Sequence, residues 1–521
     1  MLSDIEIAQK AKMKLIADVA KKAGIKPEEI DLNGCYKAKI SLSALKRLKA
    51  RRDGKLILVS TMTPTQQGEG KTTITIGLTQ ALRQAGKNAI VCIREPSLGP
   101  VMGMKGGAAG GGYSQVLPMD DINLHLTGDM HMITSAHNLL TAMLYNHIHQ
   151  GNELGIDDSR IVWKRVMDMN DRALRGTFDI TASSEVMAIL CLSRNITDMK
   201  KRLGNIIIAY NKSGEPVRAR DIKAEGAMAL LMWHALKPNL VQTLENGPAF
   251  IHGGPFANIA HGCNSLVATQ LSLKLADYVV TEAGFGSDLG AEKFFNIKCR
   301  VGKLKPAAAV LVVTSQAIER HGYENLEKHI KNIRLFGVPA VVAVNRKTAD
   351  TKQQLDQIVD RCSKFGVDCV IADVWAKGGK GGQALVKTVI ELCRKRSGFK
   401  TLYELNSPVK YKIEVIARDI YGADGVEFTE EARRDLELLE KHELTDLPVC
   451  VAKTQYSLSD DPKVFGRPTN FRITVRSLKP SAGAGFIVAY TGTIMTMPGL
   501  PRHPAAENMD VNENGKIKGL F

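Results

Sequence analysis

The cysteines have no paired spacing, and the chain has no long apolar run. Nine cysteines, an odd number, are scattered along 521 residues, and no two of them form a C-x-x-C pair. This pattern argues against a disulfide framework or a cysteine-based zinc site and indicates reduced thiols. No run of about 18 apolar residues occurs, and the first residues, MLSDIEIAQK, carry acids where a secretory leader has its apolar core. We therefore expect a cytoplasmic protein without a membrane partner.

Aromatic residues are also scarce, at 5% of the chain against 46 glycines. The position of each tryptophan or phenylalanine is therefore more informative about structure and function than usual. The net charge is +16, which favours anionic partners such as nucleotides, although a soluble basic surface explains it equally well. The lysines and arginines are dispersed, and neither an RNA-binding aromatic motif nor a basic arm is present. We expect small anionic substrates and no nucleic acid.

Residues 55–87 combine the parts of a phosphate-binding turn. The run KLILVS predicts a strand, TMTPTQQGEGKTT a glycine-containing turn and ITIGLTQALRQAGKN a helix. Residues 65–72 fit the pattern G-x-x-x-x-G-K-[ST] everywhere except at its first glycine. A strand-to-helix turn with a chance Gly-Lys pair is the weaker alternative. We predict that the phosphates of a nucleotide, which the resemblance described below implies to be ATP, are bound by Thr65, Gln66, Gln67, Gly68, Glu69, Gly70, Lys71 and Thr72.

The residue types suit phosphate chemistry. Gly68 and Gly70 allow several backbone N–H groups to face one anion, and the following helix adds the positive end of its dipole. Lys71 supplies a mobile cation. Thr72 or Thr73 offers a hydroxyl to the Mg²⁺ that accompanies the nucleotide, and we assign this contact to Thr72.

Further polar residues follow neighbouring apolar runs. Arg94 and Glu95 come directly after NAIVCI, and ligands bind at the carboxyl edge of parallel sheets. An arginine there can clamp a phosphate or carboxylate, a surface salt bridge being the alternative. INLHLTGD alternates like a half-buried strand and ends in Asp129, an acid placed to order magnesium or water, and His131 follows as a polar contact. We predict Lys71, Arg94, Asp129 and His131 as catalytic residues.

A glycine-rich loop follows at residues 99–113, GPVMGMKGGAAGGGY. A flexible linker is the alternative, but Lys105 and the ordered flanks favour a backbone closely approached by a ligand. The string GMKGGAAGGGY resembles the first signature of the formate–tetrahydrofolate ligase family. NLVQTLENGPAFIHGGPFANIAHGCNS, VVTEAGFGSDLGAEKFFNIKCR, DVWAKGGKG and GTIMTMPGLP extend the resemblance over essentially the whole chain.

The resemblance implies an enzyme that joins formate to tetrahydrofolate, using ATP with Mg²⁺ and passing through formyl phosphate. It implies that Phe285 and Trp375 lie against the folate, core packing being the alternative for both rings, with Glu95 as a polar contact. It also implies a homo-oligomer, a homotetramer in this family, and activation by a monovalent cation, K⁺ or NH₄⁺.

The chain departs from the family pattern at several positions. Lys347 stands where the family commonly has a phenylalanine that sandwiches the pterin with the tryptophan. The absence of that phenylalanine removes roughly 0.5–1.5 kcal/mol of stacking energy, which the Lys347 cation over the pterin ring would partly replace. Gln316 and Glu319 stand where the second signature has Arg and Lys, and two loops are shorter. A diverged relative that binds ATP but has lost or changed its folate substrate is therefore the alternative function.

The alternation of predicted strands and helices indicates an α/β protein. We expect a P-loop NTPase-type, mostly parallel sheet flanked by helices, with additional smaller α/β domains. The expected divisions are a nucleotide-binding domain at residues 1–300, a second α/β domain at 301–400 that contributes to the folate cleft, and a small C-terminal α+β domain at 401–521.

Overall fold

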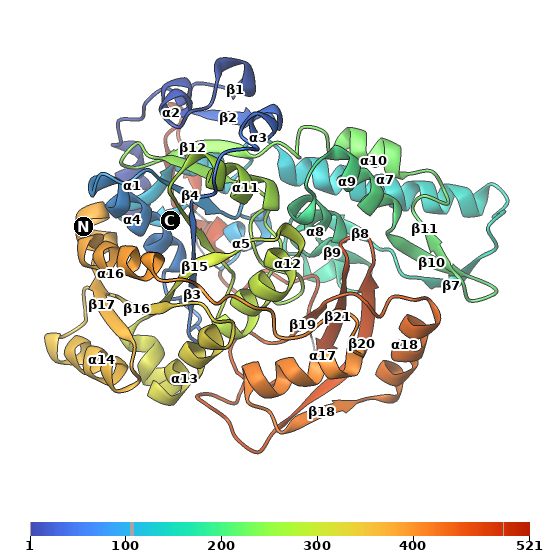
Figure 1. Ribbon diagram of the computed structural model, residues 1–521. Helices are drawn as coiled ribbons and strands as arrows, with labels where there is room; N and C mark the ends of the chain where they lie inside the picture. The colour runs from blue at the N-terminus through green and yellow to red at the C-terminus, as the bar shows by residue number, and fades with distance from the viewer. Residues whose placement is uncertain (1, 105–108, 493, 521) are drawn as a thin grey trace.

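The structure is a computed structural model that describes residues 2–104, 109–492 and 494–520. Its centre is a sheet with the strand order β1-β2-β12-β13-β4-β14-β3-β15-β16-β17 (Figure 1). From β13 to β17 all neighbours are parallel, whereas the β1 end is antiparallel. The predicted α/β class is confirmed. The strands are β1 (Ile30–Asn33), β2 (Lys37–Ile40), β12 (Asn239–Thr243), β13 (Pro248–Ile251), β4 (Ala89–Ile93), β14 (Tyr278–Glu282), β3 (Lys55–Thr61), β15 (Pro306–Val313), β16 (Ala340–Asn345) and β17 (Asp368–Ala372).

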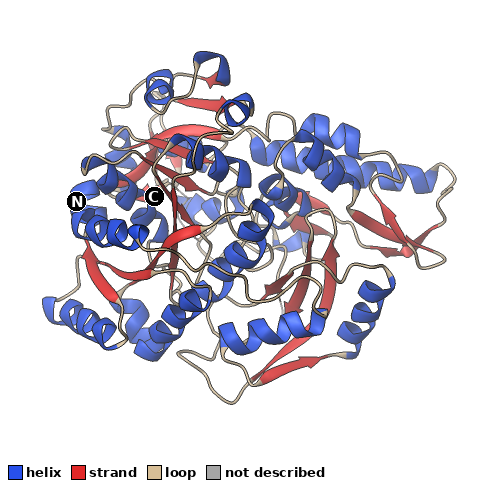
Figure 2. Ribbon diagram, in the orientation of Figure 1, coloured by secondary structure: helices blue, strands red, loops and turns tan. Residues whose placement is uncertain are grey.

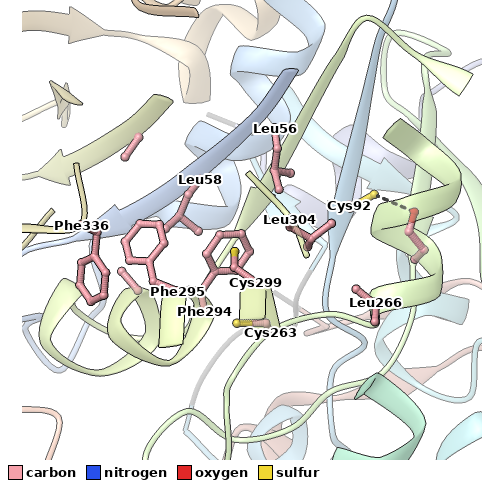
Figure 3. Close-up of a cluster of buried hydrophobic side chains, with 14 of the residues drawn as sticks. Leu56, Leu58, Cys92, Cys263, Leu266, Phe294, Phe295, Cys299, Leu304 and Phe336 are labelled. Carbon is pink, nitrogen blue, oxygen red and sulfur yellow. Dashed lines mark hydrogen bonds between the residues drawn. The ribbon is translucent and has the colours of Figure 1, made fainter. Parts of the chain in front are cut away.

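Strand β3 is buried on both faces, which explains its continuous apolar sequence. Leu56 and Leu58 point to one face and pack in the cluster that includes Phe294, Phe295 and Phe336 (Figure 3). Ile57 and Val59 point to the other face, because side chains alternate along a strand. Helices cover both faces (Figure 2). They are α4 (Lys71–Gln84) and α16 (Gln383–Arg394) on the second face, and α11 (Leu266–Leu275) and part of α13 (Ser315–Leu335) on the first.

The cysteines behave as buried thiols. All nine are unpaired, and seven of them are buried. Cys92, Cys263 and Cys299 belong to the cluster of Figure 3. Burial raises the pKa of Cys92 to about 12, so this thiol stays protonated.

A second, antiparallel sheet with the order β11-β10-β7 forms a separate layer with four helices. Its core includes Leu140, Leu190 and Ile208, all fully buried. The elements are β7 (Ile156–Ile161), β10 (Ile207–Asn211), β11 (Pro216–Arg218), α7 (Asp129–His149), α8 (Glu185–Leu192), α9 (Ile196–Gly204) and α10 (Glu225–Leu231).

The C-terminal part carries a mixed sheet with the order β18-β20-β21-β19. The division into three domains stays a prediction, and β15 to β17 pair within the same sheet as β3. The elements are β18 (Gly425–Phe428), β19 (Val449–Ala452), β20 (Arg472–Ser481), β21 (Phe486–Thr491), α17 (Val409–Val415) and α18 (Glu430–Lys441).

The strand predicted for residues 122–129 is wrong. Helix α6 (Met119–Asn123) ends inside this segment, and α7 begins at Asp129. Leu126 and Gly128 have φ values of 30° and 88°, which no strand accommodates. The alternating apolar side chains serve a compact turn instead, because Ile122 and Leu126 pack beside β4 and β12.

Among the helices in the described part of the chain, none combines the length and apolarity that a membrane crossing needs. Residues 105–108 of the glycine-rich loop, including Lys105, lie outside the described residues.

Candidate functional site

The turn after β3 has the backbone of a phosphate-binding loop. Gly68 and Gly70 have φ values of 78° and 72°, and α4 begins directly afterwards at Lys71. A Cβ atom on Gly70 would lie 2.3 Å from Nδ2 of Asn345, so a larger residue would strain the backbone and also displace this amide. The predicted strand, turn and helix are therefore present in the right order.

Glu69 holds the turn in shape. Its Oε1 accepts hydrogen bonds from the backbone N–H and the hydroxyl of Thr65, at 2.7 and 2.9 Å, and its Oε2 accepts one from Thr314. Its backbone carbonyl accepts from Nδ2 of Asn345 at 2.9 Å. The Glu69 side chain is buried, whereas Gln66 and Gln67 are exposed. Within the predicted ATP site, Thr65 and Glu69 therefore shape the loop.

A carboxylate connects the turn to Arg94. Thr72, the second residue of α4, donates its hydroxyl to Oε2 of Glu282 at 2.8 Å. Oε1 of the same carboxylate lies 4.0 Å from Nε of Arg94. Glu282 ends β14, the strand between β3 and β4. The phosphate-binding turn and Arg94 therefore lie at the same carboxyl edge of the sheet.

Arg94 is held by backbone atoms. One guanidinium nitrogen donates to the carbonyl of Pro255 at 3.2 Å. A Cβ on Gly284 would lie 3.0 Å from the same guanidinium, so the missing side chain makes room for it. Arg94 is part-buried, with its side chain 23% exposed. A partly accessible guanidinium between two glycine-containing loops can receive a carboxylate or phosphate.

Glu95 and Asp129 are buried close to one another. Burial raises the pKa of Glu95 well above its usual value, and the Asp129 carboxylate raises it further. Asp129 itself is fully buried and makes an ion pair with Lys39 at 2.7 Å. It also accepts a hydrogen bond from Asn239 at 2.8 Å. The structure therefore gives Asp129 the partners of a structural ion pair, and the catalytic role predicted for it stays a prediction.

His131 lies two residues further along α7 and is exposed. Residues two apart on a helix point in nearly opposite directions. The structure therefore does not place the His131 ring beside Asp129, and its catalytic role stays a prediction.

Three of the four predicted folate contacts follow three different strands. Phe285 follows β14, is half-buried and has a φ of 57°. Lys347 follows β16, and its backbone N–H donates to Asp350 at 2.7 Å. Trp375 follows the neighbouring strand β17, is half-buried, and accepts the N–H of Tyr113 through its carbonyl at 2.7 Å. The end of the glycine-rich loop thus contacts the tryptophan, while the folate role of all three residues stays a prediction.

Three residues of this site carry no assigned role from the sequence, namely Glu282, Asn345 and Thr314. Glu282 and Asn345 are the last residues of β14 and β16, and Thr314 directly follows β15. Polar residues at the carboxyl ends of parallel strands are the signal that could have found them.

Comparison with known proteins decides the family. A sequence profile described as formate–tetrahydrofolate ligase matches residues 2–521. The chain belongs to the formate–tetrahydrofolate ligase family. The formate–tetrahydrofolate ligase of Bacillus licheniformis is 56% identical over 555 aligned positions, which cover this whole chain and 99% of the relative. The alignment is longer than the 521 residues of this chain, as expected when loops are shorter here.

The departures from the family's second signature lie on the surface of α13. Gln316 and Glu319 are exposed. Tyr323, on the same helix, is half-buried with the Arg361 guanidinium 5.7 Å from its ring centre. Farther along α13, Asn325 donates to the hydroxyl of Thr63, at the start of the phosphate-binding turn, at 2.9 Å. The substitutions change an exposed helix face and leave this contact in place.

Proposed function

We propose that this chain catalyses the ATP-dependent ligation of formate to tetrahydrofolate through formyl phosphate, with 10-formyltetrahydrofolate, ADP and phosphate as products. Family membership over residues 2–521 supports the reaction. The observation that carries the proposal is that one carboxylate, that of Glu282, contacts Thr72 and also lies close to Arg94. It thereby connects a triphosphate-binding turn to a cation suited to a small carboxylic acid.

In the first step an oxygen of formate attacks the γ-phosphorus of ATP, and the bond from that phosphorus to ADP breaks. Phosphoryl transfer asks the protein mainly for positioning and charge neutralisation. Lys71 and the N–H groups of the turn meet the phosphates, and Arg94 holds the carboxylate of formate. Mg²⁺, when bound with the nucleotide, neutralises further phosphate charge. The hydroxyl of Thr72 and the carboxylate of Glu282 offer the oxygen donors that this ion prefers.

In the second step the N10 amine of the folate attacks the formyl carbon, phosphate leaves, and the amine gives up its proton. We place the folate against Phe285 and Trp375, with the Lys347 cation over the pterin ring. Glu95 completes the contacts: burial raises the pKa of its carboxyl well above the usual value, and a protonated carboxyl can donate a hydrogen bond.

The proposal extends to the conditions in which the enzyme works. The family resemblance supports activation by a monovalent cation, K⁺ or NH₄⁺, and assembly into a homo-oligomer. The cysteine usage supports a cytoplasmic location.

The test is an assay of the purified protein with ATP, Mg²⁺ and formate, with and without tetrahydrofolate. We expect ADP release and 10-formyl product that both depend on folate, and loss of both in Lys71→Ala. Nucleotide binding without formyl transfer would support the alternative, a diverged ATP-binding relative. The comparisons give that alternative no support.

A further inference from the structure

Glu282 lies between the phosphate-binding turn and Arg94. Strand β14, which it ends, separates β3, which leads to the phosphate-binding turn, from β4, which leads to Arg94. The residue is 2% exposed. Its two carboxylate oxygens face different partners, Thr72 on one side and Arg94 on the other.

The contact with Arg94 is incomplete. A separation of 4.0 Å is too long for a hydrogen bond. Within the described residues, Nε of Arg94 is buried and has no hydrogen-bond partner. Charges removed from water are stable only when they are well paired. The geometry therefore leaves Glu282 able to accept a further cation on the Thr72 side, and leaves Arg94 able to accept a further anion.

The donor set on the Thr72 side suits magnesium. Mg²⁺ is usually bound by one or two carboxylates together with substrate phosphates and water. P-loop enzymes hold it between the hydroxyl of the turn and an acid on another strand of the sheet. Thr72 and Glu282 occupy these two places, already joined at 2.8 Å.

We propose that Glu282 couples magnesium-nucleotide binding to binding of the acid substrate, an inference that rests on the proposed function. When the magnesium nucleotide is bound, the charge of the Glu282 carboxylate pairs with the metal beside Thr72. Arg94 is then available to bind the carboxylate of formate. Glu282 is thus a positioning residue for the acid, acting through Arg94.

The direction of the coupling follows from the charges. In the absence of metal, the anionic Glu282 competes with formate for the guanidinium and repels it. Neutralisation of Glu282 by the divalent cation removes both effects, so formate binds more tightly. By thermodynamic reciprocity, formate must tighten magnesium-nucleotide binding by the same factor.

Isothermal titration calorimetry with the β,γ-imido analogue of ATP tests this coupling without catalysis. The titration is made in Mg²⁺ and in EDTA, each with and without formate. For the wild type we expect Mg²⁺ to tighten analogue binding by about tenfold, and formate to tighten it by a further fivefold or so only when Mg²⁺ is present. Glu282→Gln keeps the shape of the side chain but not its charge. We expect it to lose both effects to within about twofold.

Two further variants complete the test. Glu185→Gln is the matched control, because its carboxylate accepts from the N–H groups of Gly483 and Ala484 outside this site, and it should keep both effects. If circular dichroism shows that Glu282→Gln does not fold, Glu282→Asp replaces it, with reduced coupling expected because the shorter side chain retracts from Thr72.

The outcomes separate the two proposals. Wild-type coupling in a folded Glu282 variant overturns the inference and leaves the proposed function standing. Loss of analogue binding by Glu282→Gln in EDTA as well assigns Glu282 a purely structural role and also overturns it. Failure of the wild type to bind the analogue at all overturns both.

Discussion

Phe285 adopts a backbone conformation that an aromatic residue rarely takes. Its φ of 57° is left-handed, which costs a residue with a Cβ atom roughly 1–2 kcal/mol. It stands between Gly284 and Gly286, and its side chain is half-buried. Strain of this kind persists where the surrounding structure holds it, and it gathers at ligand sites. The conformation therefore favours a ligand-facing ring over the core packing that the sequence left open.

Replacing Phe285 tests this strain directly. Phe285→Gly and Phe285→Ala both remove the ring, but only glycine accepts a positive φ without a penalty. We expect the glycine variant to be more stable than the alanine variant by about 1 kcal/mol in urea unfolding. Both should weaken folate binding by about tenfold through lost stacking and burial. Equal stability of the two variants would show that the backbone is not strained here.

Individual residues were predictable where the signal is local. Lys71 and Thr72 follow from the spacing of the turn, and Arg94 follows from its place after an apolar run. The partners of two acids were not predictable, because Glu282 meets Thr72 and Asp129 meets Lys39 across long stretches of chain. The sequence shows a charged residue at a strand end but not what lies opposite.

At the scale of elements, the position of β14 between β3 and β4 sets the geometry of the site, because it places Glu282 between the phosphate-binding turn and Arg94. Hydrophobic patterns predict that strands exist but not the order in which they pair. The rule that ligands bind at the carboxyl edge correctly placed the turn and Arg94 on one edge. It could not show that a third strand separates them and contributes Glu282.

The link between β2 and α7 gives a prediction about Asp129. The ion pair between Lys39 and Asp129 is buried at both ends, with side chains 7% and 0% exposed. Removing one charge leaves the other uncompensated, so we expect Asp129→Asn to cost about 3–5 kcal/mol in urea unfolding. The turnover per folded site, counted by nucleotide titration, should change little. The double variant Lys39→Met with Asp129→Leu should recover most of the stability, because it removes both charges.

The opposite result would restore the role predicted from the sequence. If Asp129→Asn unfolds like the wild type yet turns over far more slowly, Asp129 acts on the substrates or the metal. Stability and turnover must therefore be measured on the same preparation.

For the whole molecule, buried polar contacts join the C-terminal part to the region around the phosphate-binding turn. Lys453, directly after β19, lies 3.2 Å from Asp288, and both are fully buried. Asn325 donates to the Thr63 hydroxyl and also to the carbonyl of Gly466. No local sequence pattern marks such contacts, since their partners are far apart in the chain. The C-terminal part therefore helps to hold the region around the phosphate-binding turn in place, although its sequence showed no site of its own.

Glu292 makes this junction sensitive to pH. It is fully buried, and its Oε1 accepts a hydrogen bond from Asn296 at 2.6 Å. Burial raises the pKa of Glu292 from 4.5 to about 7. Because this pKa is higher in the folded state than in the unfolded state, its stabilising contribution is complete below pH 4.5. It is lost progressively as the pH rises to about 7.

The variant Glu292→Gln keeps an acceptor for Asn296 and removes the titration. We therefore expect its stability relative to the wild type to increase between about pH 4.5 and 7, by roughly 3 kcal/mol in total, and to stay level above pH 7. Urea unfolding of both proteins across this range measures the difference, and Glu431→Gln on the exposed first turn of α18 is the control, with no such increase expected. A difference that stays constant through this range would mean that Glu292 is already ionised in the folded protein, compensated by Lys293 and Arg300 in spite of its burial.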